Sequence, residues 1–454
     1  MTLRRVFSVL GLMLVAASPL RAENLADALR DAYQNSGLLE QNRAVLRAAD
    51  EDVAQSLAAL RPVITWQARS TYTANSGAVE NQITDDISSS LSLNLDLLLL
   101  DGGASAIATE AQKELVLQTR QGLVEIEQNV LFRAVEAYMN VRRNTEFVAL
   151  RRSNVGVINQ ELRAANDRFQ VGEVTRTDVA LAEARLASAR SLLAAAEGNL
   201  AQAVEEYRAA VGRAPGRLDV VGPAAVQYSL DDARAFAVRR HPSIVGAQHA
   251  VTFTELNIRR AEAALQPRLR LQGTVSMDED LDSTESLGLT YGGTLYQGGQ
   301  LQSAIRQAQA RRDGARANLL VTSQGINQTV GNAYALLNVA RASREASDQQ
   351  IRAARTAFRG VREEATLGAR TTLDVLNAEQ ELLDAQANSI SAQADEVVAT
   401  YRVLASLGLL TAEYLNLAVQ RYDPAAYYNL VQDAPATYSA QGQALDRVLR
   451  SIGD

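Results

Sequence analysis

The chain contains no cysteine. Disulfide bonds, thiolate chemistry and a lipid anchor on a cysteine are therefore excluded. Its two histidines, His241 and His249, leave little material for a histidine-rich metal site or a Ser-His-Asp triad. We therefore expect no metal, no cofactor and no catalytic residue, and no motif indicates an enzyme. Since His241 precedes Pro242 near the start of an expected helix, a loop or helix-capping role is the simpler interpretation.

Long apolar runs are confined to the N-terminus. The first 22 residues have a basic start at Arg4 and Arg5 and an apolar run from Val6 to Ala17. This run is too short to span a bilayer, so residues 1–22 are predicted to be a secretory signal peptide. No later stretch approaches 18 unbroken apolar residues, and a transmembrane helix is not predicted. The segment holds three arginines and no acidic residue, so its removal moves the formal charge from −7 to −10, which disfavours a nucleic-acid partner.

Proline is scarce, and none lies between Pro62 and Pro215 or between Pro267 and Pro424. Proline inside a helix costs about 3 kcal/mol, so its absence permits very long helices. The Ala-, Leu-, Glu-, Gln- and Arg-rich stretches 103–171 and 299–367 are each predicted to form a helix roughly 100 Å long. A second helix is predicted near 175–211 and 371–407, and apolar residues at alternating spacings of three and four predict antiparallel coiled coils.

The same plan occurs twice in the chain. The Leu-x-Pro tripeptide at 60–62 recurs 205 positions later, and further features recur 196 positions later. These features are Asp101-Gly102-Gly103 with Gln297-Gly298-Gly299, Ala137-Tyr138 with Ala333-Tyr334, and Gly172, Thr175 and Asp178 with Gly368, Thr371 and Asp374. This period is much longer than the roughly 20–50 residues of a solenoid repeat. We predict a duplicated domain with repeats at 23–212 and 229–410, a linker at 213–228 and a tail at 411–454, the second copy being nine residues shorter between Pro267 and Gln297.

A further helix is expected to open each repeat, near 25–60 and 230–265. Each is about half as long as the long helix of its repeat, and so is the helix that follows. Two half-length helices stacked end to end would match one long helix. The expected architecture is therefore a cylinder about 100 Å tall, in which long helices alternate with stacked pairs.

The apolar period changes from 3.6 to 2 between the opening helix and the long helix of each repeat. This predicts four strands, at about 63–73, 87–98, 268–277 and 286–296, each apolar on one face and polar on the other. The pattern fits either a half-buried soluble sheet or the lipid-facing wall of a barrel. Because four strands cannot close a barrel, a membrane location requires several chains to share one. The polar tips at 74–86 and 278–285 should hold the nine-residue difference.

The ordered, duplicated motifs resemble the TolC family, the outer-membrane efflux proteins of Gram-negative bacteria, over about residues 23–410. The resemblance is carried by the two glycine turns before the long helices, by Arg168-Phe169, Gly172, Thr175 and Asp178-Val179, and by Gly368, Arg370-Thr371 and Asp374-Val375-Leu376. It implies an α+β membrane protein whose long antiparallel α-helical coiled coils form a periplasmic tunnel. Four strands would be this chain's share of a trimeric transmembrane β-barrel of about twelve. The segments 212–228 and 411–454 would form an equatorial belt.

The implied function is a passive exit duct in the outer membrane, part of a tripartite efflux or type I secretion system. The resemblance implies a homotrimer in outer-membrane lipid, a periplasmic adaptor and an inner-membrane pump, which is an ABC exporter or a proton-driven exporter. The sequence does not choose between drug, metal and protein cargo, because the pump selects it. An alternative from another class is a soluble periplasmic coiled-coil scaffold, which would leave four amphipathic strands without a partner.

The periplasmic tip is where we expect function to concentrate. Each helix after the tip turn starts with Thr-x-x-Asp, which predicts a capping box. The resemblance implies further roles. Asp374 would line the constricted entrance in a threefold carboxylate ring that favours cations. Arg370 would hold the entrance closed by pairing with Asp178 on a neighbouring helix. Adaptor docking is implied for the two turns, at Val171, Gly172, Glu173, Leu367, Gly368 and Ala369.

Three positions depart from the family pattern. Asn377 stands where better-known members carry a second acidic residue one turn after the first, which predicts a thinner carboxylate ring and a weaker cation block. Ala365 stands where some relatives have a tyrosine that helps to lock the gate. Glu173 replaces a residue that is usually apolar in the docking turn, so the adaptor is expected to differ accordingly.

Overall fold

The computed structural model describes residues 23–76, 83–436 and 438–453. The predicted signal peptide at 1–22 therefore lies outside the described residues. The chain forms two compact units. The first comprises Met1–Asn35, Arg133–Ala224 and Ala340–Val398, and the second comprises Ser36–Phe132, Ala225–Val339 and Ala399–Asp454.

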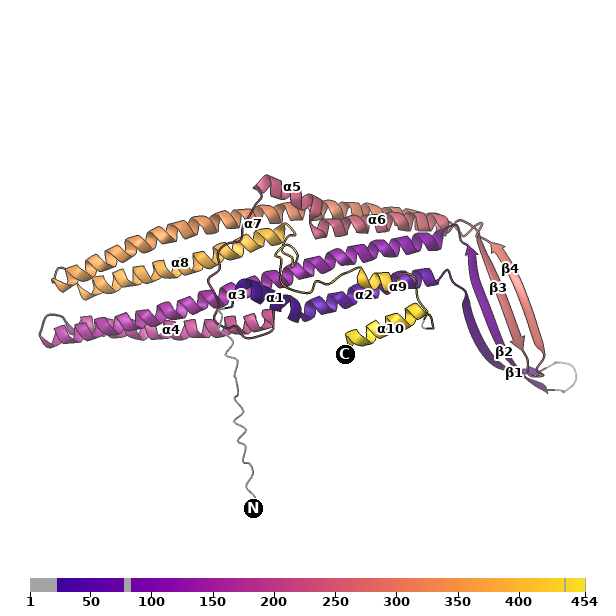
Figure 1. Cartoon of the computed structure of the whole chain (residues 1–454), viewed down its shortest axis with the longest axis horizontal. Helices are drawn as coiled ribbons and strands as arrows, with labels where there is room; N and C mark the ends of the chain where they lie inside the picture. Colours follow the sequence, from indigo (N-terminus) through magenta and orange to yellow (C-terminus); the bar gives the residue numbers. More distant parts are fainter. Residues whose placement is uncertain (1–22, 77–82, 437, 454) are drawn as a thin grey trace, which may run out of the picture. The chain divides into compact units, whose positions relative to one another are not determined.

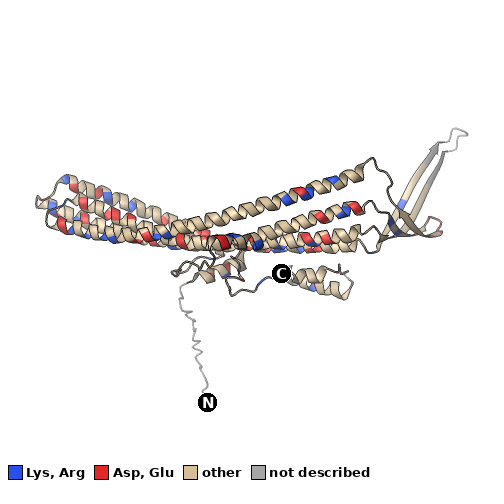
Figure 2. Cartoon of the chain, turned by 90° about the horizontal axis from the view of Figure 1, so that it is seen from above, with Lys and Arg blue, Asp and Glu red and all other residues tan. Residues whose placement is uncertain are grey.

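The first unit is built from antiparallel helices. The long helices α3 (Ala104–Gln170) and α7 (Gln300–Thr366) enter it with their C-terminal parts, and they turn back as α4 (Arg176–Val211) and α8 (Thr372–Ser406). Figure 1 shows α4 running beside α3, and α8 beside α7. A core of Ile158, Leu186 and Ala189 joins α3 to α4. Charged residues of both signs are interspersed along these helices, as the ribbon colours of Figure 2 show.

The second unit contains α2 (Gly37–Ala58), α5 (Leu230–Arg240), α6 (Pro242–Ala263), α9 (Ala426–Val431) and α10 (Ala440–Gly453), together with the sheet. Its core brings Leu46 and Val53 of α2 against Val116 of α3, with Tyr422 and Tyr428 of the tail packed on them. Among the described residues, no helix is both long and apolar enough to cross a bilayer.

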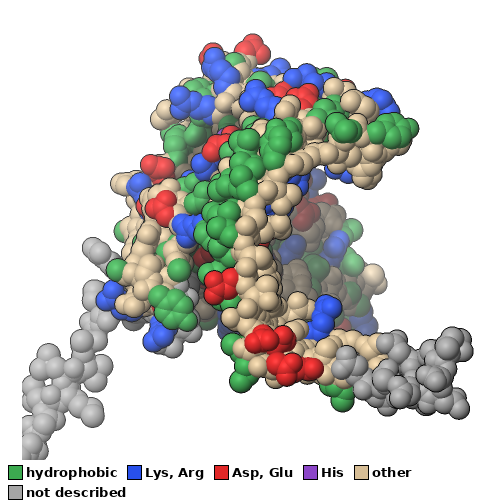
Figure 3. All heavy atoms as spheres, turned by 90° about the vertical axis from the view of Figure 1, so that its right-hand side faces the viewer, with side chains coloured by type: hydrophobic (Ala, Val, Ile, Leu, Met, Phe, Trp, Pro, Cys, Tyr) green, Lys and Arg blue, Asp and Glu red, His purple; other side chains and the backbone are tan. Residues whose placement is uncertain are grey.

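The sheet is antiparallel in the order β1 (Val63–Ser76), β2 (Ile83–Leu100), β3 (Arg268–Met277) and β4 (Ser283–Gly292), as Figure 1 shows. Its register places the predicted apolar residues opposite one another on one face. These residues include Ile64, Trp66, Leu91, Leu93, Leu95, Leu269, Leu271, Val275, Leu287, Leu289 and Tyr291. Several of them are more than half exposed, and hydrophobic side chains form a band over the sheet in Figure 3. The opposite face is polar, with Arg270 paired to Asp96 at 2.9 Å.

The nine-residue difference lies at the sheet tip, as expected. Tyr72 pairs with Ile87, whereas the corresponding pair in the second hairpin, Met277 and Ser283, already closes that hairpin. The extra residues therefore lengthen β1 and β2 rather than only the loop between them. The expected fourth strand at 286–296 was wrong at its end, because the ladder stops where Arg268 pairs with Gly292. Pro267, which precedes Arg268, has no N–H to extend the ladder.

The prediction of a single opening helix in each repeat was wrong. The first is divided into α1 (Leu25–Asn35) and α2, because Ser36 leaves the helical conformation and its side chain accepts the Leu39 N–H. The second is divided into α5 and α6 by Pro242, which disfavours helical geometry in the residue before it. As expected, His241 caps the new helix, and its Nδ1 accepts the Ser243 N–H at 3.2 Å.

The duplication is visible in the backbone. Helices α3 and α7 each have 67 residues. Eight glycines of the described segments have positive φ, and they form four pairs that lie 196 positions apart: Gly102 with Gly298, Gly103 with Gly299, Gly172 with Gly368, and Gly212 with Gly408. Each repeat therefore makes the same turns before the long helix, at the tip and after the returning helix.

Candidate entrance gate at the coiled-coil tip

The two tip turns have the same geometry. After α3, Gly172 has a φ of 80° and Glu173 N–H bonds to the carbonyl of Arg168 at 2.9 Å. After α7, Gly368 has a φ of 78° and Ala369 N–H bonds to the carbonyl of Glu364 at 2.9 Å. A glycine in this left-handed conformation is the usual way to end a helix, because other residues are strained there.

The six predicted docking residues form the surface of these turns. All of them are exposed, and the apolar side chains among them are among the most exposed of the chain, with Val171 at 71% and Leu367 at 85%. Apolar side chains at such exposure are available for a partner, which supports, but does not test, their predicted docking role.

Both predicted capping boxes are formed. In the first repeat, the Asp178 carboxylate accepts the Thr175 N–H at 2.9 Å and hydroxyl at 2.7 Å, and Asp178 N–H donates to the hydroxyl at 3.3 Å. In the second, Asp374 and Thr371 make the same bonds at 3.0, 2.9 and 3.2 Å. These hydrogen bonds from threonine hold the pKa of both aspartates below the ordinary value, so both are ionised at neutral pH.

The expected pairing of Arg370 with Asp178 is not present within the chain. Arg370 Nε instead donates to Glu364 Oε2 at 2.8 Å, and both side chains are about half exposed. The Asp178 carboxylate already accepts two hydrogen bonds from Thr175, whereas Glu364 lies on the same α7–α8 turn as Arg370. Both turns nevertheless contribute to one open cleft of about 620 Å³, which Arg168, Asp178 and Arg370 help to line.

Two positions that depart from the family pattern can be placed. Asn377 is exposed on α8 and accepts a hydrogen bond from Arg185 of α4 at 3.4 Å, so it links the two coiled coils. Ala365 is buried at the end of α7.

Sequence reasoning missed one buried polar pair in this unit. Asn154 of α3 donates from Nδ2 to Glu379 Oε1 of α8 at 2.9 Å, and each residue is only 7% exposed. The available signal was Glu379 itself, a carboxylate that lies one helical turn before the seam residue Leu383 and one turn after Leu376.

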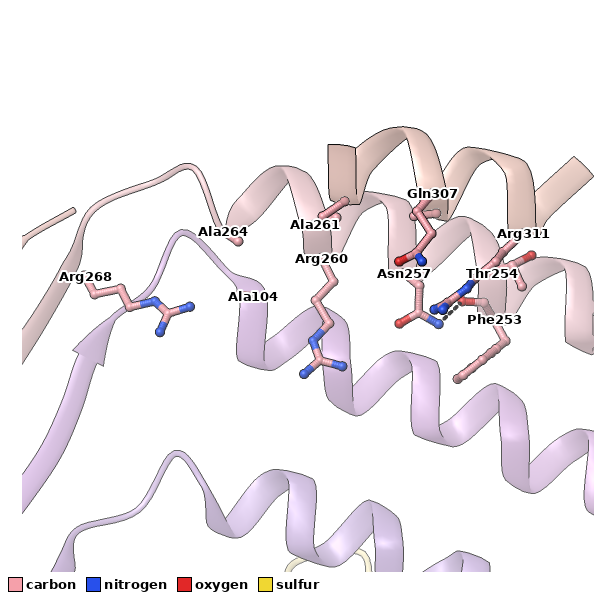
Figure 4. A pocket seen from close by; sticks show the side chains of 12 residues that line it. Ala104, Phe253, Thr254, Asn257, Arg260, Ala261, Ala264, Arg268, Gln307 and Arg311 are labelled. Carbon is pink, nitrogen blue, oxygen red and sulfur yellow. Dashed lines mark hydrogen bonds between the residues drawn. The ribbon is translucent and has the colours of Figure 1, made fainter. Parts of the chain in front are cut away.

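A second cleft, of about 500 Å³, lies in the other unit at the base of the sheet. Figure 4 shows Arg260 of α6 and Arg268 of β3 directed towards the start of α3 at Ala104, and Arg311 of α7 beside Asn257. No carboxylate in the described part of the chain forms an ion pair with any of these three arginines. The cleft is therefore basic, but its arginines are exposed and no group in it indicates a ligand.

The family model described as outer membrane efflux protein matches residues 28–213 and 236–409. The outer membrane efflux protein BepC of Brucella suis is 35% identical over 421 residues, which cover 91% of each chain. The outer membrane protein TolC of Escherichia coli is 24% identical over 434 residues, covering 90% of this chain and 87% of TolC. The crystal structure of the Campylobacter jejuni CmeC outer membrane channel matches with a TM-score of 0.76 at 15% identity, covering 92% of each chain.

Proposed function

Because the chain belongs to the outer membrane efflux protein family, and is an outer-membrane exit duct with a large periplasmic part, we propose that its two coiled coils form the gated entrance of that duct. Channels of this family are trimers that work with periplasmic adaptors and inner-membrane pumps. The apolar band on one face of the four-stranded sheet, away from the polar residues at its tip, supports a lipid-facing wall completed by two further copies. With that face in lipid, the soluble-scaffold alternative has no support.

The domain plan that we propose is two repeats, 23–212 and 229–410, bound by the linker 213–228 and the tail 411–454. Support for the tail as a belt comes from its contacts. The Arg43 guanidinium of α2 lies 5.0 Å from the Tyr422 ring centre, and Tyr427 donates to Glu51 of the same helix at 2.6 Å. The tail is therefore attached to α2 along several turns.

The main support for the proposed gate is the arrangement of charged residues at the second tip turn. Between Glu364 and Asp374 it holds the Arg370–Glu364 ion pair and the carboxylate of Asp374, which is ionised at neutral pH. Three copies around an axis would bring three Asp374 carboxylates together, and such rings select cations. The pairing of Arg370 with Asp178 on a neighbouring helix stays a proposal, and it is supported by the cleft that both side chains line. We further propose that the exposed tip turns dock the adaptor and that the duct performs no chemistry.

We propose efflux, rather than type I protein secretion, as the first candidate for the transport process. The relative named as an efflux protein shares 35% identity over 91% of this chain, whereas the alkaline protease secretion protein AprF of Pseudomonas aeruginosa shares 24% over 65%. The inner-membrane pump would then be a proton-driven exporter, with an ABC exporter as the second candidate.

Ion selectivity in planar bilayers tests the entrance ring. We expect the cation preference of the full-length protein to fall in Asp374→Asn, because three negative charges leave the narrowest part of the path. The control is Glu381→Gln, which removes an exposed carboxylate from the same helix away from the tip turn and should leave the cation preference in place. Equal selectivity in both variants and the wild type would reject the ring.

A further inference from the structure

The pair formed by Asn154 and Glu379 lies where the two coiled coils of one chain meet. Asn154 is on α3 of the first repeat, and Glu379 is on α8 of the second. Only one oxygen of the Glu379 carboxyl group is bonded. The other, Oε2, is buried and has no hydrogen-bond partner among the described residues. The contact between α3 and α8 therefore contains a buried carboxyl group with only one of its two oxygens hydrogen-bonded.

An ionised carboxylate is poorly suited to this place. One neutral amide donor does not offset the cost of burying a charge, whereas the neutral acid avoids most of that cost. The charge of Arg362 of α7 acts on Glu379, but its guanidinium faces Glu161 of α3 at 3.7 Å. From α4, Arg185 bonds to Asn377 rather than to Glu379. If Glu379 were ionised, it would compete with Glu161 for one guanidinium.

The pKa of the Glu379 carboxyl group is shifted in the direction that this geometry predicts. Burial raises the pKa of Glu379 to about 7, helped by the charge of Glu161 and opposed by Asn154 and Arg362. The two tip aspartates have lowered pKa values, so their charge is constant in the range where Glu379 titrates.

We propose that Glu379 is a proton-operated latch between the two coiled coils of each chain. The neutral side chain stays packed on Asn154 and holds α8 against α3, whereas the ionised side chain weakens this contact and favours separation of the helices. This inference rests on the proposed gating function.

The direction of the pH effect follows from linkage. A carboxyl group exposed by separation returns to its ordinary pKa, so the packed state binds the proton more tightly than the separated state. The packed state is therefore fully favoured below the ordinary pKa of glutamate and loses its advantage as the pH rises to about 7. Each unit of difference between the two pKa values changes the packing equilibrium about tenfold.

The duplicated chain supplies a natural comparison. The residue 196 positions before Glu379 is Glu183 of α4, and it is exposed, while the counterpart of Asn154 is the exposed Gln350. The buried pair therefore occurs in only one of the two corresponding places, and Glu183 and the exposed Glu381 of α8 are matched controls.

The first test is single-channel recording of the full-length protein in planar bilayers between pH 5 and pH 8. For the wild type we expect the open fraction to rise about tenfold or more over this range. Glu379→Gln keeps an acceptor for Asn154 but carries no charge, so its open fraction should remain at the low-pH value. Glu183→Gln and Glu381→Gln should follow the wild type. A Glu379→Gln curve that rises like the wild type, or a flat wild-type curve, would overturn the latch.

A second readout separates the latch from the duct itself. Because the chain has no cysteine, the exposed positions Ser153 and Asp384 can be changed to cysteine and spin-labelled without background. In lipid nanodiscs, the distance between the labels should lengthen from pH 5 to pH 8 and stay constant when Glu379→Gln is added. A lengthening without any conductance would reject the duct and keep the latch. Conductance that rises with pH at constant distance would reject the latch.

Discussion

The two repeats contain the same ion pair in different surroundings. Arg120 of α3 faces Asp50 of α2 at 4.0 Å, and their counterparts Arg316 and Glu255 form a pair at 2.6 Å. The side chain of Asp50 is fully buried, whereas that of Glu255 is 42% exposed. The Arg120 guanidinium lies 5.3 Å from the ring centre of Tyr428, which belongs to the tail. The tail covers the first pair, and no comparable cover lies over the second within the described chain.

A pair of tyrosines shows the same contrast more weakly. The hydroxyl of Tyr138 lies 2.9 Å from the carbonyl oxygens of both Glu23 and Asp219 and is fully buried. Its counterpart Tyr334 donates to the carbonyl of Tyr228 at 2.8 Å and is 9% exposed. Each tyrosine ties the long helix of its repeat to the segment before its opening helix. Duplication has kept both the tyrosine and its bond to a backbone carbonyl, while the burial of the two tyrosines differs.

The largest difference between the repeats is expected at the ion pairs. Arg120→Met leaves the buried Asp50 without its cation and should cost about 2–4 kcal/mol of unfolding free energy, whereas Arg316→Met should cost less than about 0.5 kcal/mol because exposed pairs contribute little. Denaturant titration followed by circular dichroism in detergent measures both. Equal losses would show that the tail does not distinguish the repeats.

The loss in Arg120→Met should also depend on pH. Burial raises the pKa of Asp50 to about 6, so its folded form favours the neutral acid, and stability falls as the pH rises towards that value. Near pH 4 the carboxyl group is neutral in the wild type and the variant, and the two should differ little. Near pH 7 the charge must be buried, and the difference should be largest.

A smaller difference is expected for the tyrosines. Tyr138→Phe removes the hydroxyl shared by two carbonyl groups, one of them on the buried Glu23, and should cost about 1–3 kcal/mol, whereas Tyr334→Phe should cost about 1 kcal/mol. Paired unfolding curves measure the comparison. A larger loss in Tyr334→Phe would mean that the second repeat, not the first, depends more on its anchor.

No difference is expected at the tip glycines, where the repeats have the same geometry. Gly172→Ala and Gly368→Ala each place a side chain at positive φ without any close neighbour, so each should cost about 1 kcal/mol. Hydrogen exchange of the amides flanking each turn reports the local loss. A loss confined to one variant would show that the two turns are not equivalent.

Much of the fold was readable from the sequence because its signals are local and repeated. The absence of proline and the 196-residue offset predicted the long helices, and the alternation of apolar residues predicted the face of the sheet. The divisions at Ser36 and His241 were missed because a single capping residue is a weak signal inside a helical pattern.

The site was only partly readable. The Thr-x-x-Asp spacing predicted both capping boxes, since their partners are three residues apart. The Arg370–Glu364 pair depends on how the side chains around one turn are directed. The Asn154–Glu379 pair depends on how two helices that are distant in the sequence pack together. Periodicity in one helix does not specify which face meets a neighbour, so Glu183 and Glu379 could not be told apart from the sequence.

We propose that the tip turn of the second repeat closes an outer-membrane duct, and unitary conductance in planar bilayers tests this closure most directly. We expect small steps for the wild type and clearly larger steps for Arg370→Ser, because this change removes the cation that the proposed contact with Asp178 requires. Inserted channels whose conductance is unchanged in Arg370→Ser would contradict the gate, and protein that is stable without detergent and never inserts would contradict the duct.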